Sequence, residues 1–207
     1  MNIARILYPI EVLGPGKRVG VWTSGCQHNC FGCSNPELWV ADKKQQIPVE
    51  ALTDILTTTF RSAEVDGFTI TGGDPFYQPK ELSELLLFLS KWTEDILVYT
   101  GFTIEELQQM HDLYVDACLT EIAVLIDGPY IEALNNNCPL RGSSNQRILY
   151  LKEKFRPKYE SHLLNYKNSI QNFSLSDGII SVGIHNKNFK SDLQKKAKER
   201  GVIIDGD

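Results

Sequence analysis

The sequence lacks a long hydrophobic run and an excess of positive charge. Residues 1–9 contain neither the apolar core nor the small-residue cleavage site of a signal peptide, and no apolar stretch approaches the length of a membrane span. We therefore expect a cytoplasmic protein with no membrane partner. The formal net charge is −5, whereas general nucleic-acid-binding proteins are normally basic, so we also expect no nucleic-acid partner.

Cysteine is scarce and unevenly placed. Three of the five cysteines, Cys26, Cys30 and Cys33, fall within eight residues, whereas Cys118 and Cys138 are isolated. An odd number of cysteines, clustered in this way in a chain without a secretion signal, is not typical of a disulfide framework. The spacing indicates a metal site instead.

Repeats and low-complexity segments are also missing, but strand-like and helix-like patterns alternate. We expect strands at 19–23, 67–71, 96–99 and 122–126, helices at 49–61 and 79–92, and a helix capped by Thr103. This order predicts an α/β fold with a parallel sheet built from βαβ units. The length and the ordinary globular composition suit one core domain, residues 1–150, with a small C-terminal extension, residues 151–207.

The pattern in the C-terminal extension is weaker. Residues 148–155 fit a strand or a helix, and residues 173–184 resemble a β-hairpin that turns at Asp177-Gly178. A basic helix is expected at 190–200, with its lysines on a solvated face and Gly201 ending it. We expect His185 to be structural.

Unusual residues follow four of the predicted strands. They are Cys26 after the first strand, the Gly72-Gly73-Asp74-Pro75 turn after the second, Thr100 after the third and Asp127 after the fourth. The carboxyl ends of parallel strands meet at one edge of a sheet, and that edge is where α/β proteins form their sites. The sequence therefore predicts one site that draws on all four motifs.

The three clustered thiols favour an iron–sulfur cluster. A structural zinc ion normally takes four ligands, and a four-iron cluster takes one ligand per iron. Three cysteines therefore leave one iron without a protein thiolate, open to another ligand. The alternatives are a zinc ion with His28 as fourth ligand, a redox dithiol at Cys30 and Cys33, and surface thiols without function.

The spacing CxxxCxxC after a strand, followed by Gly72-Gly73-Asp74-Pro75 after the next, resembles the radical S-adenosylmethionine (SAM) superfamily. Within that superfamily, the sequence is similar to the activating proteins of anaerobic ribonucleoside-triphosphate reductase. The segments that carry this narrower resemblance are residues 14–16, 24–26, 31–36, 99–101, 127–129 and 141–146. It covers residues from about 10 to 150.

The resemblance implies a partial (β/α) barrel of the radical SAM type, with outer helices around a parallel sheet. It also implies a [4Fe-4S] cluster held by Cys26, Cys30 and Cys33, with SAM as the second cofactor. SAM would be bound by Gly72, Gly73, Asp74, Pro75, Thr100 and Asp127. No side chain is assigned a catalytic role.

The residues leave several of these roles open. Asp74 can orient its turn without touching SAM, and Thr100 and Asp127 can be turn residues. Many members of the superfamily have an aromatic residue where this chain has Gly32. Adenine would therefore need another contact, for which Phe31 and Trp39 are the candidates. We expect His28 to face solvent or to lie behind the ligands.

The resemblance implies an activase that reductively cleaves SAM to a 5′-deoxyadenosyl radical. This radical would generate a glycyl radical on a large anaerobic enzyme, expected to be ribonucleoside-triphosphate reductase, with a flavodoxin or a ferredoxin-type protein as electron donor. The alternative is a radical SAM enzyme with a small-molecule or peptide substrate, such as a 7-carboxy-7-deazaguanine synthase-like enzyme or a peptide maturase. The alternative in which the protein is not an enzyme is a zinc-bound interaction module.

Overall fold

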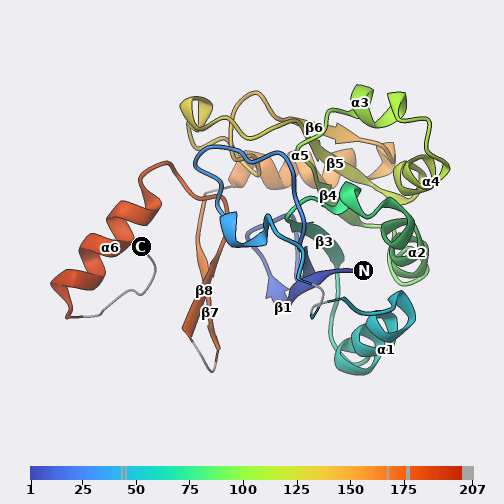
Figure 1. The fold of residues 1–207 in the computed structure, drawn as a ribbon, viewed down its shortest axis with the longest axis horizontal. Helices are drawn as coiled ribbons and strands as arrows, with labels where there is room; N and C mark the ends of the chain where they lie inside the picture. Colours follow the sequence, from blue (N-terminus) through green and yellow to red (C-terminus); the bar gives the residue numbers. More distant parts are fainter. Residues whose placement is uncertain (43, 45, 167, 176–177, 202–207) are drawn as a thin grey trace.

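A six-stranded sheet forms the centre of the molecule in the computed structural model, which describes residues 1–42, 44, 46–166, 168–175 and 178–201 (Figure 1). The strands lie in chain order: β1 (Ile3–Ile10), β2 (Arg18–Thr23), β3 (Gly67–Gly72), β4 (Ile96–Tyr99), β5 (Val124–Asp127) and β6 (Arg147–Tyr150). The four inner strands are parallel, whereas β1 and β6 run antiparallel to their neighbours. The predicted α/β class and parallel inner sheet are confirmed, and the sheet of the described residues is open.

Helices cover one face of this sheet. They are α1 (Val49–Phe60), α2 (Pro79–Leu89), α3 (Ile104–Gln109) and α4 (Leu113–Glu121). The helix expected at 79–92 is α2, which ends three residues earlier than expected, at Leu89. Apolar residues three or four positions apart in α1 and α2, such as Leu52 and Leu56, pack against Val19 and Val21 of β2. Thr103 caps α3 as predicted, in a capping box with Glu106.

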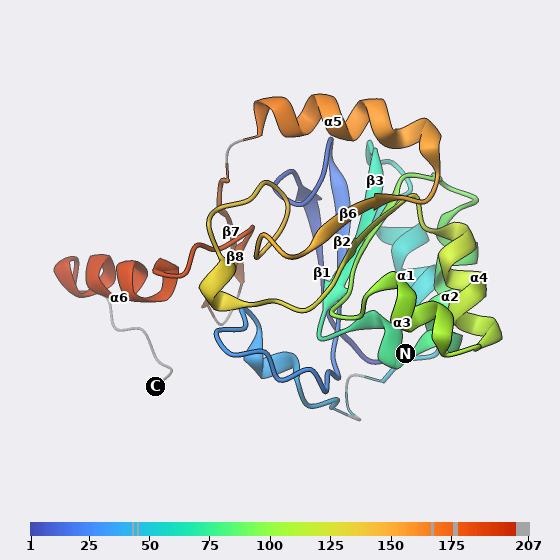
Figure 2. The ribbon, with the colours of Figure 1, turned by 90° about the horizontal axis from the view of Figure 1, so that it is seen from above.

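The C-terminal extension covers part of the other face. It contains α5 (Arg156–Asn165) and a two-stranded hairpin of β7 (Gln171–Leu175) and β8 (Gly178–Val182), called here the C-terminal hairpin. Figure 2 shows the hairpin on the opposite side of the sheet from α1, α2 and α4, with α5 across one end. The hairpin is confirmed where it is described, but Asp177 of its expected turn lies outside the described residues.

The helix α6 (Phe189–Glu199) projects away from the rest of the molecule (Figures 1 and 2). It confirms the basic helix expected at 190–200, and Gly201 follows it with φ +69°. No residue of α6 is buried. No helix in the described part of the chain is both long enough and apolar enough to span a bilayer.

A buried ion pair joins α5 to the end of the sheet away from the cysteines. The Arg18 side chain is fully buried, and its Nη1 atom donates to Oδ1 of Asp95 at 3.1 Å. Tyr159 and Lys158 of α5 donate to the same carboxylate, at 2.7 and 2.6 Å. A buried charge is tolerated only when it is paired and hydrogen-bonded, so this network depends on α5 being in place.

Four short 3-10 helices among the described residues and some shifted boundaries complete the fold. The 3-10 helices are η1 (Pro36–Leu38), η3 (Pro75–Tyr77), η4 (Glu132–Leu134) and η5 (Glu153–Phe155). The strand expected at 122–126 starts two residues later, at Val124. The ambiguous segment 148–155 contains most of β6 and then η5, and the sequence did not predict β1.

Candidate functional site

One cavity lies at the carboxyl ends of β2, β3 and β4, where the sequence predicts the site. Seven of the predicted site residues line it: Cys26, Cys30, Cys33, Gly72, Gly73, Asp74 and Thr100. Two others, Pro75 and Asp127, are buried beside it and do not line it. Three of the four strand-end motifs therefore meet directly in one space.

The three cysteines belong to a loop, residues 26–33, that leaves the end of β2. Backbone hydrogen bonds close its base, from Gly25 N to Leu38 O and from Cys26 N to Trp39 O, each 2.9 Å. Gly32 has φ +71°, and a Cβ atom there would lie 2.5 Å from Oε1 of Glu132 in η4. The Glu132 side chain is flexible and could move aside, but the positive φ is a conformation that residues with side chains rarely adopt, so an aromatic residue just before the third cysteine would be strained.

The cysteine loop brings three thiols to one cavity. Among the described residues, no three His, Cys, Asp or Glu side chains lie close enough together to hold one ion. The thiolates of a four-iron cluster bind different irons and so stand further apart than the ligands of one zinc ion. Cys118 and Cys138 do not line the cavity, so a cluster there would have three protein thiolates.

The thiols of Cys26 and Cys30 are partly shielded from solvent in this loop. Burial in the loop raises the pKa of both above the ordinary value, although nearby backbone N–H groups act in the opposite direction. A bound metal reverses this balance, because coordination deprotonates a thiol. The loop is thus arranged for thiols that ionise when they bind iron.

The buried carboxylate of Asp74 connects the motifs. It accepts hydrogen bonds from the hydroxyl of Thr100 (2.9 and 3.0 Å), Gly101 N (2.8 Å) and Phe76 N (3.0 Å). The Nε2 atom of His28 lies 2.9 Å from its Oδ2 atom. These contacts place Asp74 as the residue that orients the turn. His28 lines the cavity beside the cysteines, and its ring packs edge-on against Phe102.

The two glycines before Asp74 are required by the protein's own backbone. A Cβ atom on Gly72 would lie 2.3 Å from the carbonyl oxygen of Thr23, and Gly72 has φ +121°. A Cβ atom on Gly73 would lie 2.5 Å from the carbonyl oxygen of Gly25. Hydrogen bonds from Gly73 N to Thr23 O (2.8 Å) and from Asp74 N to Gly25 O (3.0 Å) seal the contact. The end of β3 thus lies directly against the start of the cysteine loop.

Thr100 and Asp127 use their polar atoms within the protein. The Thr100 hydroxyl donates to Asp74 and accepts from Phe102 N at 3.1 Å. Asp127 accepts from Ile104 N, at the start of α3, and from Nε of Arg147, each at 2.9 Å. The Asp127 carboxylate is therefore paired with the Arg147 guanidinium.

Of the two aromatic residues proposed to contact adenine, only Trp39 lines the cavity. Phe31 is 81% exposed and does not border the cavity. The sequence could not separate the two, because both lie close to the cysteines along the chain.

The segment 141–146, for which the sequence indicated no mechanism, forms a closed loop at the rim. The Gln146 side chain accepts from Gly142 N (2.9 Å) and Ser143 N (3.2 Å) and donates to Gly128 O (2.9 Å). Two residues of this loop, Gly142 and Gln146, line the cavity. Its polar side chains therefore hold the rim in shape.

Sequence reasoning missed several parts of the cavity wall, among them Arg5 of β1, Tyr130 and the segment 180–185 at the end of the C-terminal hairpin. Tyr130 follows the Asp127-Gly128-Pro129 turn, and that position is the only signal that could have indicated it. The hairpin lies about 150 residues from the cysteine loop in the sequence. No local pattern there indicates what it packs against.

Comparison with known proteins agrees with the family resemblance found in the sequence. A family model described as a 4Fe-4S single cluster domain matches residues 12–149. The anaerobic ribonucleoside-triphosphate reductase-activating protein of Enterobacteria phage T4 is 37% identical over 154 residues, which cover 72% of this chain and 93% of that protein. Proteins of the same name from Escherichia coli and Vibrio cholerae are 30% and 34% identical, over 70% and 68% of this chain and 96% and 93% of their own lengths.

Proposed function

This chain belongs to the family of anaerobic ribonucleoside-triphosphate reductase-activating proteins, and from that premise we propose that it generates a glycyl radical on such a reductase. The observation that carries the proposal is the cavity in which three cysteine side chains meet the ends of β3 and β4. A cluster bound there by three thiolates keeps one iron free of protein ligands. That iron would be open to the same cavity.

The chemistry itself belongs to the cofactors. When bound, the reduced [4Fe-4S] cluster supplies the electron that splits SAM into methionine and a 5′-deoxyadenosyl radical, which takes a hydrogen atom from the substrate glycine. The protein's part is to hold, orient and enclose. We propose Cys26, Cys30 and Cys33 as the cluster ligands, each in the half-buried loop at the cavity.

The residues around the cysteines would position SAM in different ways. We propose that the backbone of Gly72 and Gly73 borders its methionine part and that Trp39 borders its adenine. Asp74 and Pro75 would act by fixing the turn, because the Asp74 carboxylate is already fully engaged. Thr100 and Asp127 would act in the same indirect way, by shaping the ends of β4 and β5.

The remaining features of the proposal concern the fold and the partners. The open sheet with helices on one face is consistent with a short (β/α) barrel of the radical SAM type, which leaves one side accessible to a polypeptide loop. We further propose residues 1–150 as the radical SAM core, a flavodoxin or ferredoxin-type electron donor, and a cytoplasmic location.

The test is anaerobic reconstitution with iron and sulfide, followed by reduction in the presence of SAM and a candidate anaerobic reductase. We expect a brown protein, formation of 5′-deoxyadenosine, and a glycyl doublet in the electron paramagnetic resonance (EPR) spectrum of the reductase. A colourless protein that binds zinc tightly would contradict the proposal. So would 5′-deoxyadenosine formation that needs a small molecule and never produces a glycyl radical.

A further inference from the structure

The C-terminal hairpin lies outside the part of the chain matched by the family model, which ends at residue 149. Its last residues nevertheless line the same cavity as the three cysteines. The wall that they form, residues 180–185, therefore lies beyond the segment that the family model matches. The question is what this wall contributes to the site.

The hairpin is firmly anchored in this position. Val182 is 4% exposed and packs in one apolar cluster with Leu13 and with Trp22 of β2. The side chain of Gln171 donates to the carbonyl of Pro9 at 2.6 Å and accepts from Glu11 N at 3.1 Å. Burial of apolar surface together with this pair of hydrogen bonds holds the hairpin against the end of β1.

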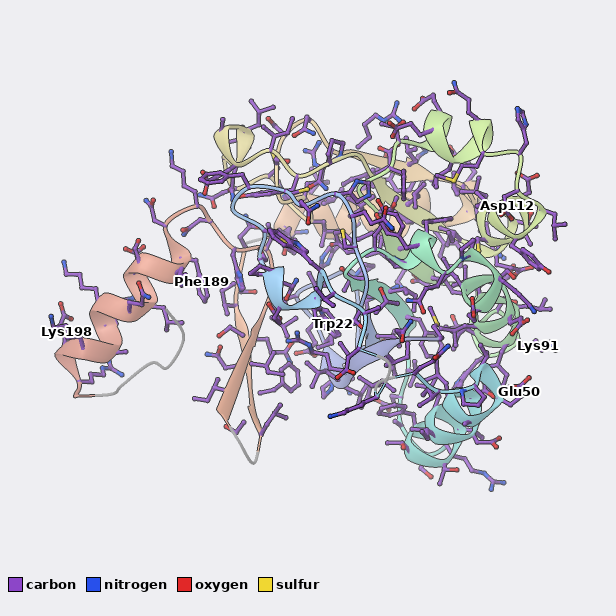
Figure 3. All side chains as sticks on the ribbon, in the orientation of Figure 1. Trp22, Glu50, Lys91, Asp112, Phe189 and Lys198 are labelled. Carbon is purple, nitrogen blue, oxygen red and sulfur yellow. The ribbon has the colours of Figure 1, made fainter. Side chains whose placement is uncertain are left out.

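His185, the last residue of this wall, is held from two sides. Its carbonyl oxygen accepts a hydrogen bond from Nδ2 of Asn135 at 2.9 Å. Its ring stacks on Phe189, with ring centres 4.0 Å apart and an angle of 7° between the planes. Phe189 lies where α6 leaves the body of the molecule (Figure 3). The ring thus has a defined place at the edge of the cavity.

The Nε2 atom of His185 is buried and has no hydrogen-bond partner among the described residues. A buried polar atom without a partner is costly and uncommon in folded proteins, so it calls for an explanation. Burial also lowers the pKa of the imidazole. A neutral imidazole has one donor and one acceptor nitrogen, and it does not repel a cationic sulfonium compound.

We propose that the C-terminal hairpin completes the SAM pocket of this chain and that Nε2 of His185 forms a hydrogen bond with bound SAM. The proposal rests on the function proposed above, which places SAM in this cavity. SAM offers hydroxyl, carboxylate and ring-nitrogen partners, and the cavity is shared by the cysteines and the histidine. His185 is thus a positioning residue contributed by the extension.

The chain offers a matched control in His162 of α5. Its Nε2 atom is also buried without a partner among the described residues, and burial lowers its pKa as well. His162 borders a separate hollow near Lys158 and Tyr166, away from the cysteines. Replacement of the two histidines therefore compares the same chemical change inside and outside the proposed pocket.

The experiment measures SAM binding by equilibrium dialysis on the reconstituted full-length protein, without turnover. The variants are His185→Ala, His185→Gln and His162→Ala, each checked for iron content and for its thermal unfolding transition. We expect His185→Ala to weaken SAM binding by about three- to tenfold, as loss of one neutral hydrogen bond does. His185→Gln, whose amide can donate from a similar position, should restore part of this loss, and His162→Ala should bind as the parent does.

Three results would overturn the proposal. The first is a His185→Ala variant that binds SAM as tightly as the parent with a full cluster. The second is equal loss of binding in both His185 variants together with loss of iron, which would assign the histidine to folding alone. The third is a parent protein that holds its cluster but does not bind SAM, and that result alone would also refute the proposed function.

Discussion

The Nε2 atom of His28 lies 2.9 Å from Oδ2 of Asp74. A residue between two of the cysteines is thereby joined to the end of β3, 46 positions away in the sequence. The same carboxylate also binds the Thr100 hydroxyl and Gly101 N at the end of β4. One buried carboxylate therefore sets the position of the cysteine loop relative to two strands, and four predictions follow from the site and its support.

The first prediction concerns the cluster ligands. Replacement of Cys26, Cys30 or Cys33 by Ala should remove most of the roughly four irons per chain expected for one cluster and abolish SAM cleavage. Iron analysis and the visible spectrum after anaerobic reconstitution measure the first effect. Cys138→Ala is the control, because this half-buried thiol does not line the cavity. Full iron content in any of the three variants would refute that ligand assignment.

The second prediction concerns Asp74. In Asp74→Asn, one acceptor oxygen becomes an NH2 group, which cannot accept from Thr100 or Gly101 N. We expect a loss of about 1–3 kcal/mol in the free energy of unfolding, because buried donors lose their partner. Guanidinium denaturation measures it. Asp54→Asn, at an exposed position of α1, should leave stability unchanged within about 0.5 kcal/mol. Equal stability of both variants would show that the carboxylate is dispensable.

The third prediction concerns the ion pair at the other end of the sheet. Asp95→Asn leaves the Arg18 guanidinium buried without its counter-charge, and this should cost about 3–5 kcal/mol of unfolding free energy. Tyr159→Phe removes only one hydrogen bond to the same carboxylate and should cost about 1 kcal/mol. The reverse order of the two effects, measured by denaturant titration, would argue against a buried charge pair as the link to α5.

The fourth prediction concerns pH. Burial lowers the pKa of His162 and His185 below 6.5 in the folded chain. Both histidines take up protons more readily when the chain unfolds, so their contribution to stability is present above about pH 6.5 and is lost as the pH falls. The pKa values of Glu94, Glu105 and Glu153 are lowered from their ordinary value of 4.5, so the contribution of these carboxylates to stability is lost only at a pH below that value.

The unfolding temperature should therefore fall between pH 7 and pH 5, and His162→Gln should reduce this fall. Calorimetry at several pH values is the measurement. His111→Gln, which replaces an exposed histidine, serves as the control and should keep the slope of the parent. If His162→Gln kept that slope as well, burial of the imidazole would not explain the pH dependence.

Short-range sequence patterns were sufficient to predict several parts of this structure. The CxxxCxxC spacing, the double glycine before Asp74 and the alternating βα pattern predicted the edge of the sheet and an iron–sulfur site there, whereas the role of SAM was implied by the family resemblance. Leu52 and Leu56 of α1 marked a buried helix face, and Thr103 marked the start of α3. These features are readable because each depends on residues only a few positions apart, whose spacing follows directly from helix and strand geometry.

What the sequence determined by itself was therefore the set of local elements and the kind of cofactor that its cysteines suit. Only the tertiary structure decided that β1 and β6 run antiparallel, that Asp127 pairs with Arg147, and that the C-terminal hairpin lies beside the cavity. Gln171 reaches the carbonyl of Pro9 across 162 positions. Contacts of that kind arise from the closing of long loops and the burial of surfaces that are distant in the chain, and no local pattern records them.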